Sequence, residues 1–184
     1  GMSDITIKRN VISDHPGRGI QWNGEDCSDT VMQGTLVENN LIENNSWVMV
    51  MFYNVKRSVV RNNTVVIQSY PTTNEEYHTF VGIYGSSDNI FKNNIFYTTR
   101  SDVEGLIVED GTSKQNTFDY NLWKVVSNSW HWGSGRSDFI SNYKSATGWD
   151  KNGSFADPKF SSVANGMYYL NPDSPAIDRG QDSE

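Results

Sequence analysis

A short pattern of apolar and polar positions returns along this chain. Two apolar residues are followed by two mostly polar ones, then an Asn, then apolar residues again, as in Leu36-Val37-Glu38-Asn39-Asn40-Leu41-Ile42. The Asn that closes the polar part of the pattern falls at Asn10, Asn40, Asn63, Asn94 and Asn121. Self-similarity at a period of roughly 20–50 residues is typical of a solenoid, in which each repeat stacks on its neighbours.

The apolar runs within each repeat predict strands rather than helices. They are short, alternating or β-branched, and bounded by turn residues. Further strand candidates of the same kind precede or follow the Asn pattern, at 19–22, 48–52, 65–67, 80–84, 95–97 and 106–108. No stretch carries helical periodicity for the length that a helix needs. Three short strands joined by tight turns predict one coil of a parallel β-helix, and the five Asn patterns predict about five coils over residues 5–126.

The recurring Asn has a mechanical explanation. Asn tolerates the left-handed backbone that a sharp corner between strands needs, and its amide can bond within its own turn. When coils stack in register, these amides can also pair with those of the coils above and below. We therefore predict that these Asn residues form structural corners and do not bind ligands.

The end of the chain differs from the repeats. From about Asn128 the Asn pattern stops, which predicts an irregular, aromatic C-terminal cap over residues 127–184 of a single domain, 1–184. Asp157-Pro158-Lys159-Phe160, then Leu170, then Ser174-Pro175-Ala176-Ile177-Asp178-Arg179-Gly180 resembles the C-terminal end of right-handed parallel β-helix proteins of the pectate-lyase-like superfamily.

This resemblance implies an all-β fold, a right-handed single-stranded parallel β-helix. Many proteins of the superfamily are secreted and act on polysaccharides as lyases, hydrolases or epimerases. The resemblance therefore implies a polysaccharide partner and an extracellular or cell-surface location. Since fold alone does not supply chemistry, the reaction has to be argued from individual residues.

The opposite end of the predicted stack starts abruptly. The first repeat begins at Ile5, with no segment before it that could cover the end of a solenoid. An uncovered end leaves strand edges open to pairing. We therefore expect upstream residues to continue the β-helix, or another chain to cover this coil, which includes self-association.

Composition excludes several other classes. A net charge of −7 argues against nucleic-acid binding, which favours a basic surface. No apolar run approaches the length of a membrane span. Cys27 is the single cysteine, which excludes an internal disulfide and a cysteine-based metal site.

The insertion around the first long strand offers the residues of a uronate lyase. Such an enzyme neutralises the sugar carboxylate, commonly with Ca²⁺ held by acidic side chains, and removes a proton with a base. Glu25, Asp26 and Asp29 are candidate Ca²⁺ ligands, and Arg18 or His15 is the candidate catalytic base. The competing interpretation is that all five are solvated turn residues.

Aromatic residues suggest where a sugar could stack. Trp22, Tyr84, Trp130 and Trp132 are candidate substrate-binding residues. Trp130 and Trp132 lie on one side of the chain if that segment is extended. The competing interpretation is that these Trp residues pack the C-terminal cap against the last coil.

Two functional classes remain open at this stage. The first is a carbohydrate-active protein that binds or cleaves an acidic polysaccharide. A lyase is favoured over a hydrolase because no signature pairs two carboxyl groups across a cleft. The alternative is a non-catalytic binding or structural module of a larger surface protein. An acidic protein repels an anionic polymer unless cations or a local basic groove intervene, which weighs against the first class.

Overall fold

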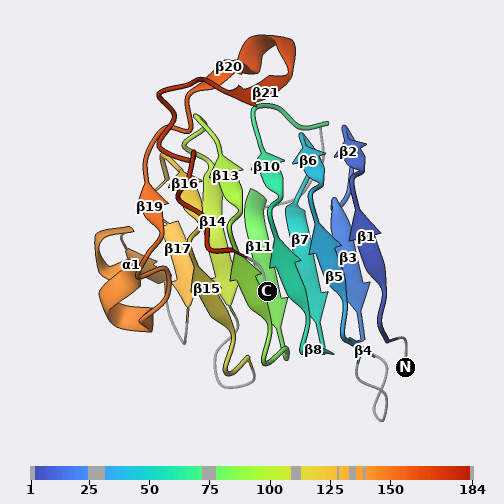
Figure 1. The fold of residues 1–184 in the computed structure, drawn as a ribbon. Helices are drawn as coiled ribbons and strands as arrows, with labels where there is room; N and C mark the ends of the chain where they lie inside the picture. Colours follow the sequence, from blue (N-terminus) through green and yellow to red (C-terminus); the bar gives the residue numbers. More distant parts are fainter. Residues whose placement is uncertain are drawn as a thin grey trace.

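The computed structural model of the chain describes residues 3–24, 32–71, 78–108, 113–127, 129–132, 136–138 and 140–182. In them the chain winds into coils whose strands form three parallel sheets (Figure 1). This is the right-handed single-stranded parallel β-helix that the sequence predicts. None of the helices in the described residues is long and apolar enough to cross a membrane.

Each coil contributes one strand to each of the three sheets. The first sheet contains β1 (Thr6–Lys8), β5 (Leu36–Glu38), β9 (Val59–Arg61), β12 (Ile90–Lys92) and β15 (Thr117–Asp119). The second contains β2 (Val11–Ser13), β6 (Leu41–Glu43), β10 (Thr64–Val66), β13 (Ile95–Tyr97), β16 (Leu122–Lys124) and β19 (Ser154–Phe155). The third contains β3 (Ile20–Asn23), β7 (Val48–Tyr53), β11 (His78–Tyr84), β14 (Val103–Val108), β17 (Ser129–Trp132) and the antiparallel β18 (Arg136–Asp138). The short strands β4 (Met32–Gln33) and β8 (Val55–Lys56) pair with each other in the segments that connect the third sheet to the first.

The core consists of columns of equivalent side chains. Because the strands pair in register, alternate residues of every coil point inward at the same position. One inward column contains Ile7, Val37, Val60, Phe91 and Phe118. In the last two coils the columns become aromatic, with Phe91 stacked on Phe118 at 4.5 Å between ring centroids and Phe96 on Trp123 at 4.0 Å.

The predicted ladder of Asn residues is confirmed. Asn63 illustrates it: its Oδ1 accepts hydrogen bonds from the backbone N–H and the Nδ2 of Asn40, both at 3.0 Å. Its own Nδ2 donates to Asn94 Oδ1 and to the Val37 carbonyl, also at 3.0 Å. The same pairing runs from Asn10 to Asn121, so one amide in every coil binds the next coil.

The left-handed backbone lies one residue earlier than the sequence suggested. In the first four coils the positive φ angles belong to the residue before the ladder Asn: Arg9 (58°), Asn39 (55°), Asn62 (56°) and Asn93 (58°). Our expectation placed this conformation at the ladder Asn itself. The left-handed residue precedes the ladder Asn for a physical reason. The ladder Asn points its amide into the stack, and the residue before it makes the sharp bend between the two strands.

The ladder ends at a carboxylate. Asp150 is fully buried, and its Oδ1 accepts hydrogen bonds from the backbone N–H and Nδ2 of Asn121 at 3.0 and 2.9 Å. Its Oδ2 accepts from Trp123 Nε1 at 2.9 Å and from the Tyr143 hydroxyl at 3.1 Å. Burial raises the pKa of Asp150, and these hydrogen bonds to the charged form oppose that rise.

The region 127–184 has two parts. In the first, α1 (Ile140–Thr147) places Tyr143 against Trp123 and Trp130, and Trp149 packs on Phe118 at 5.0 Å. This part covers the end of the stack. The sequence did not predict α1, because an eight-residue helix with a weak apolar face gives little periodic signal.

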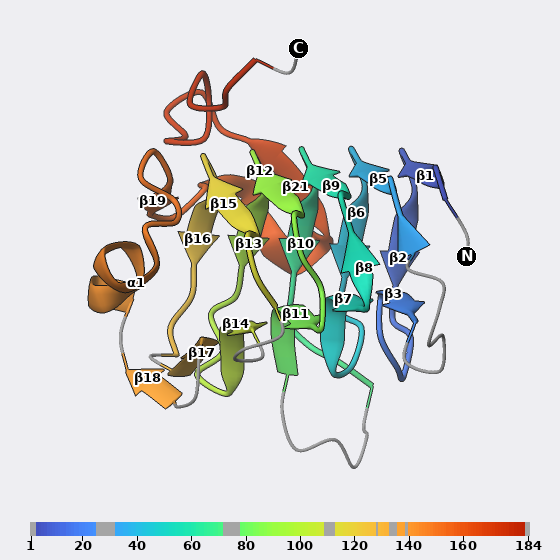
Figure 2. The ribbon, with the colours of Figure 1, turned by 90° about the horizontal axis from the view of Figure 1, so that it is seen from below.

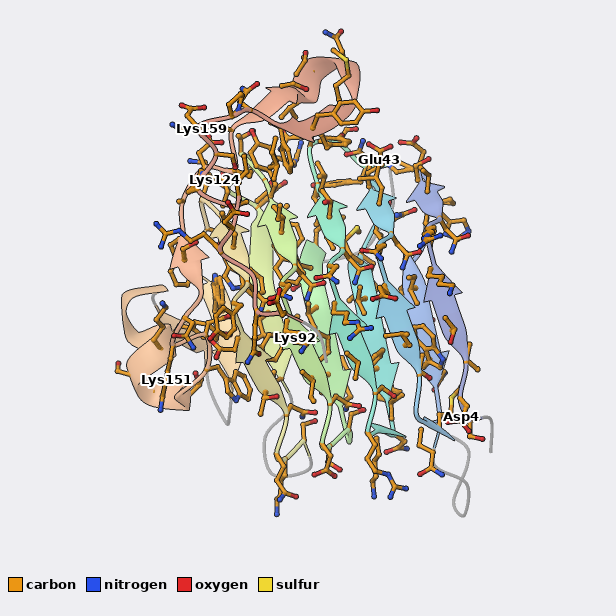
Figure 3. All side chains as sticks on the ribbon, in the orientation of Figure 1. Asp4, Glu43, Lys92, Lys124, Lys151 and Lys159 are labelled. Carbon is orange, nitrogen blue, oxygen red and sulfur yellow. The ribbon has the colours of Figure 1, made fainter. Side chains whose placement is uncertain are left out.

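The second part returns along the side of the solenoid (Figure 2). The hairpin of β20 (Phe160–Ser162) and β21 (Met167–Leu170), joined through the 3₁₀ turn η1 (Val163–Asn165), packs at the carboxyl ends of the second sheet's strands. Phe160 contacts Tyr97 edge-on at 5.4 Å between ring centroids, and the Tyr168 hydroxyl donates to Glu43 Oε2 at 2.7 Å. Figure 3 shows Glu43 beside this hairpin.

Candidate functional site

A row of cationic and aromatic side chains crosses successive coils at the turn into the third sheet. In the first coil, the Arg18 guanidinium lies 3.4 Å from the centroid of the Trp47 ring, and its Nη1 donates to Gln21 Oε1 at 3.1 Å. Trp47 has a left-handed backbone (φ 69°), and its backbone N–H donates to His78 Nδ1 at 3.1 Å. These contacts connect three successive coils.

The environment of His78 selects one form of its ring. Because Nδ1 accepts the backbone hydrogen bond from Trp47, the proton of the neutral ring lies on Nε2. His78 as a residue is 7% exposed, and its ring stacks on Tyr70 with 3.5 Å between centroids. His78 is therefore held as a hydrogen-bond donor through Nε2.

The row continues into the fourth coil through an ion pair. Arg100 donates from Nε and Nη2 to the two carboxylate oxygens of Asp102, at 2.9 and 2.7 Å. Tyr70 donates its hydroxyl proton to Asp102 Oδ2 at 2.8 Å, and the Arg100 guanidinium lies 4.6 Å from the Tyr70 ring centroid. The hydrogen bond from Arg100 lowers the pKa of Asp102 to about 2, so this carboxylate stays ionised down to acid pH.

We name this set the cationic row. Its members are Arg18, Trp47, His78, Tyr70, Arg100 and Asp102. A buried acid lies next to it, since Glu104 is 7% exposed and pairs with Thr79, the neighbour of His78. The row thus combines two guanidinium groups and an oriented imidazole at the amino-terminal ends of the third sheet's strands, with the buried Glu104 beside it.

The other end of the same face carries aromatic and amide groups. Asn23, Tyr53 and Tyr84 occupy one register position in three successive coils. The Tyr53 and Tyr84 rings stack at 4.6 Å with 10° between their planes, and both residues are half-buried. Gln21 and Asn23 are exposed. The face therefore presents a flat aromatic surface beside hydrogen-bonding groups.

Arg18 and Tyr84, both predicted from the sequence, lie on this face. His15 is exposed and its Nδ1 accepts the Gly17 N–H at 3.0 Å, which is a turn contact. The predicted Ca²⁺ ligands Glu25, Asp26 and Asp29 lie outside the described residues. Within the described ranges, no group of three or more His, Cys, Asp or Glu side chains could hold a metal ion.

Two of the four predicted sugar-stacking residues are core residues instead. Trp22 is 4% exposed and packs edge-on against Phe52 at 5.5 Å. Trp130 is fully buried and packs on Trp123 at 4.9 Å and Tyr143 at 4.8 Å, so for this residue the competing interpretation of cap packing is correct. Neither ring offers a face to a ligand. Trp132 pairs with Val108 in the third sheet, and its side chain is outside the described part.

The sequence did not single out Trp47, Arg100, Asp102 or Glu104 as site residues. The one available signal was position, since each lies at or just before the start of a long apolar strand, like Arg18. Recognising the row required knowing which coil positions stack, and the loops before these strands vary in length.

Comparison with known proteins agrees with the fold. Residues 1–147 match the family described as a right-handed beta helix region, and the chain belongs to this family. It is also similar to an uncharacterized protein of Bacillus subtilis (strain 168), YwoF, with 27% identity over 186 residues. That match covers 96% of this chain and 39% of YwoF, so the chain spans about two-fifths of its curated relative. No solved structure matches the chain.

Proposed function

We propose that this β-helix binds an acidic polysaccharide along the outer face of its third sheet, in the manner of a polysaccharide lyase of the pectate-lyase-like superfamily. The observation that carries the proposal is the cationic row, in which Arg18 and Arg100 lie among aromatic rings. The chain as a whole is acidic, so an anionic polymer needs local positive charge to bind. Arg18 supplies that charge, because Arg100 is already paired with the ionised Asp102.

The spacing of the coils supports binding of a polymer rather than a small molecule. Successive strands lie about 4.8 Å apart, so a chain running along the solenoid axis meets equivalent positions of each coil in turn. Arg18 would pair with a uronate carboxylate, and the oriented His78 ring lies behind the row and fixes the position of the Trp47 backbone. The stacked rings of Tyr53 and Tyr84, at the other end of the same strands, offer a second surface that would contact the apolar face of a sugar.

The finer form of the proposal is cleavage by β-elimination. A base removes the proton at C5 of a uronate, the C4–O bond breaks, a C4–C5 double bond forms, and the leaving oxygen takes up a proton. Arg18 supplies charge at the carboxylate, which makes the C5 proton easier to remove. Since no described cluster suits Ca²⁺, we assign no step to a metal, and a role for Glu25, Asp26 and Asp29 is tested by adding Ca²⁺.

Binding and turnover are measured together on pectic, alginate and glycosaminoglycan polymers, with and without Ca²⁺. Isothermal titration reports binding, and ultraviolet absorbance of the unsaturated product reports β-elimination. We expect Arg18→Gln to weaken binding at least about tenfold, equivalent to about 1.4 kcal/mol. The matched control is Arg57→Gln, which removes an exposed guanidinium at another corner and should leave binding within about twofold.

Binding without turnover would instead support the second candidate, a non-catalytic binding module of a larger surface protein. The coverage of YwoF favours this candidate, because more than half of that relative lies outside the matched region. Either candidate requires a polymer outside the cell, so we propose an extracellular or cell-surface location. Equal effects of Arg18→Gln and Arg57→Gln, or no binding to any acidic polymer, would contradict both.

A further inference from the structure

A second groove lies away from the cationic row, along the corner between the first and second sheets. It has a volume of about 390 Å³ and is bounded on one side by β21. Asn39, Asn62 and Thr64 line it from the coils, and Tyr168 and Tyr169 line it from the hairpin. All of its lining residues are uncharged, which distinguishes it chemically from the cationic row.

The amides of Asn39 and Asn62 are presented to this groove in the same way. Both residues have the left-handed backbone of the corner (φ 55° and 56°), in consecutive coils. Because their backbone conformations match, their side chains leave the corner in similar directions. Within the described part of the chain, neither side chain forms a hydrogen bond of its own, in contrast to the ladder amides beside them.

Asn93, the next member of this series, shows what such an amide can bind. It has the same backbone conformation (φ 58°). Its Oδ1 accepts the Gln181 N–H at 2.9 Å, and its Nδ2 donates to the Gln181 carbonyl at 2.8 Å. A corner amide thus binds a neighbouring donor and acceptor simultaneously, which is also what two adjacent hydroxyl groups of a pyranose offer.

Two tyrosines form the aromatic wall of the groove. Tyr169 is accessible to a ligand, whereas Tyr168 is held in place by a hydrogen bond. Tyr169 is 77% exposed, the most exposed large apolar side chain of the described residues. The hydroxyl of Tyr168 is held by its hydrogen bond to Glu43, and burial together with that carboxylate raises the pKa of Tyr168. Exposed aromatic rings beside hydrogen-bonding groups are typical of sites for amphipathic ligands.

We infer that Asn39, Asn62 and Tyr169 form a subsite for a neutral sugar unit. Each amide bonds a pair of adjacent hydroxyl groups, and the Tyr169 ring covers the C–H face of the pyranose. The absence of charge among the groove's lining residues makes a uronate a poor ligand here. This subsite is independent of the proposed binding of acidic polymers at the cationic row.

The test is titration with neutral oligosaccharides derived from cellulose, xylan, mannan and galactan. Tyr169→Ala and Asn62→Gly should each weaken binding at least about tenfold, and Gly keeps the left-handed corner while removing the amide. Two variants serve as controls and should leave affinity within about twofold. Met167→Ala removes an exposed apolar side chain from the same strand, and Asp88→Gly replaces a left-handed residue (φ 59°) at a different corner.

Two further measurements distinguish this subsite from sugar binding at the cationic row and from a peptide site. Arg18→Gln should leave neutral-sugar binding unchanged, whereas a loss there would assign the sugar to the cationic row and overturn the inference. Failure of every neutral oligosaccharide to bind at millimolar concentration would also overturn it. So would binding of a peptide with the sequence of residues 176–182 that depends on Asn62 and Tyr169 while no sugar binds, since the groove would then be a peptide site.

Discussion

A single side-chain amide in each coil adds its hydrogen bonds to the backbone bonds that join neighbouring coils at the ladder corner. Asn63 is 1% exposed, so no water replaces a partner that is lost there. Its side chain satisfies the backbone N–H and amide of Asn40 and the carbonyl of Val37. Each buried polar group left without a partner costs about 1–3 kcal/mol, so the loss of one ladder amide affects several groups at once.

We expect Asn63→Ala to lower the free energy of unfolding by about 3 kcal/mol or more. Urea denaturation followed by circular dichroism measures this change. The control is Asn62→Gly, one residue earlier, which leaves the ladder intact and should change stability by less than about 1 kcal/mol. Similar losses for the two variants would show that the corner as a whole, and not the ladder amide, carries the stability.

The sequence predicted this ladder because five Asn residues recur in the same context. It did not identify the left-handed residue, because two consecutive Asn residues suit a corner equally well. The first and last coils resolve the ambiguity, since Arg9 and Tyr120 take the left-handed position where the chain has no Asn pair. The ladder Asn is thus the constant element of the corner, and the residue before it varies.

At the scale of strands and helices, apolar patterning predicted most of the third sheet. The strand candidates at 48–52, 80–84 and 106–108 fall within β7, β11 and β14. The candidate site was less accessible to prediction. Arg18 lies beside Trp47 only because two coils stack, and the loops between such strands differ in length, so sequence separation does not give the register.

In strand β14, one residue lies very close to a side chain of the next coil, which the apolar pattern of the sequence did not indicate. Gly105 faces the Trp130 ring of the next coil, and a Cβ at this position would lie 2.2 Å from the ring carbon Cε2. A buried Trp130 therefore requires a residue without a side chain in the strand before it. The large ring fills the end of the core, and the glycine provides the space for it.

We expect Gly105→Ala to destabilise the protein by about 1–3 kcal/mol, as overpacking of a core does. In a Trp130→Leu background the same substitution should cost less, because the ring that the methyl group meets is absent. A double-mutant cycle from thermal or urea unfolding gives this coupling. Additive losses would show that the two residues do not interact.

On the scale of the whole molecule, the two ends of the solenoid differ. At one end, α1 and the segment leading to β19 pack on the last coil. At the other end, β1, β2 and β3 each form the edge of their sheet in the described part of the chain. Val11 in β2 is 68% exposed there. Open edges of parallel sheets pair readily with further strands.

We therefore expect the 184-residue polypeptide, taken by itself, to associate as its concentration rises, through the edge formed by β1, β2 and β3. Sedimentation velocity over a series of concentrations measures the association. Val11→Lys places a charge on the edge and should shift the equilibrium towards the monomer. Ile90→Lys alters an exposed residue (41%) in the middle of the stack and should have no effect. A monomer at every concentration, or equal effects of the two variants, would contradict the prediction.

The carboxylate at the end of the Asn ladder also bears on how such a protein changes length. An Asn corner both gives and receives hydrogen bonds, so a duplicated coil inserted between Asn10 and Asn121 would find complementary neighbours on either side. The Asp150 side chain accepts four hydrogen bonds and, when ionised, has no hydrogen to donate to a further coil. Growth by gene duplication is therefore compatible with every coil before Asp150, whereas a copy placed after it would start without a donor.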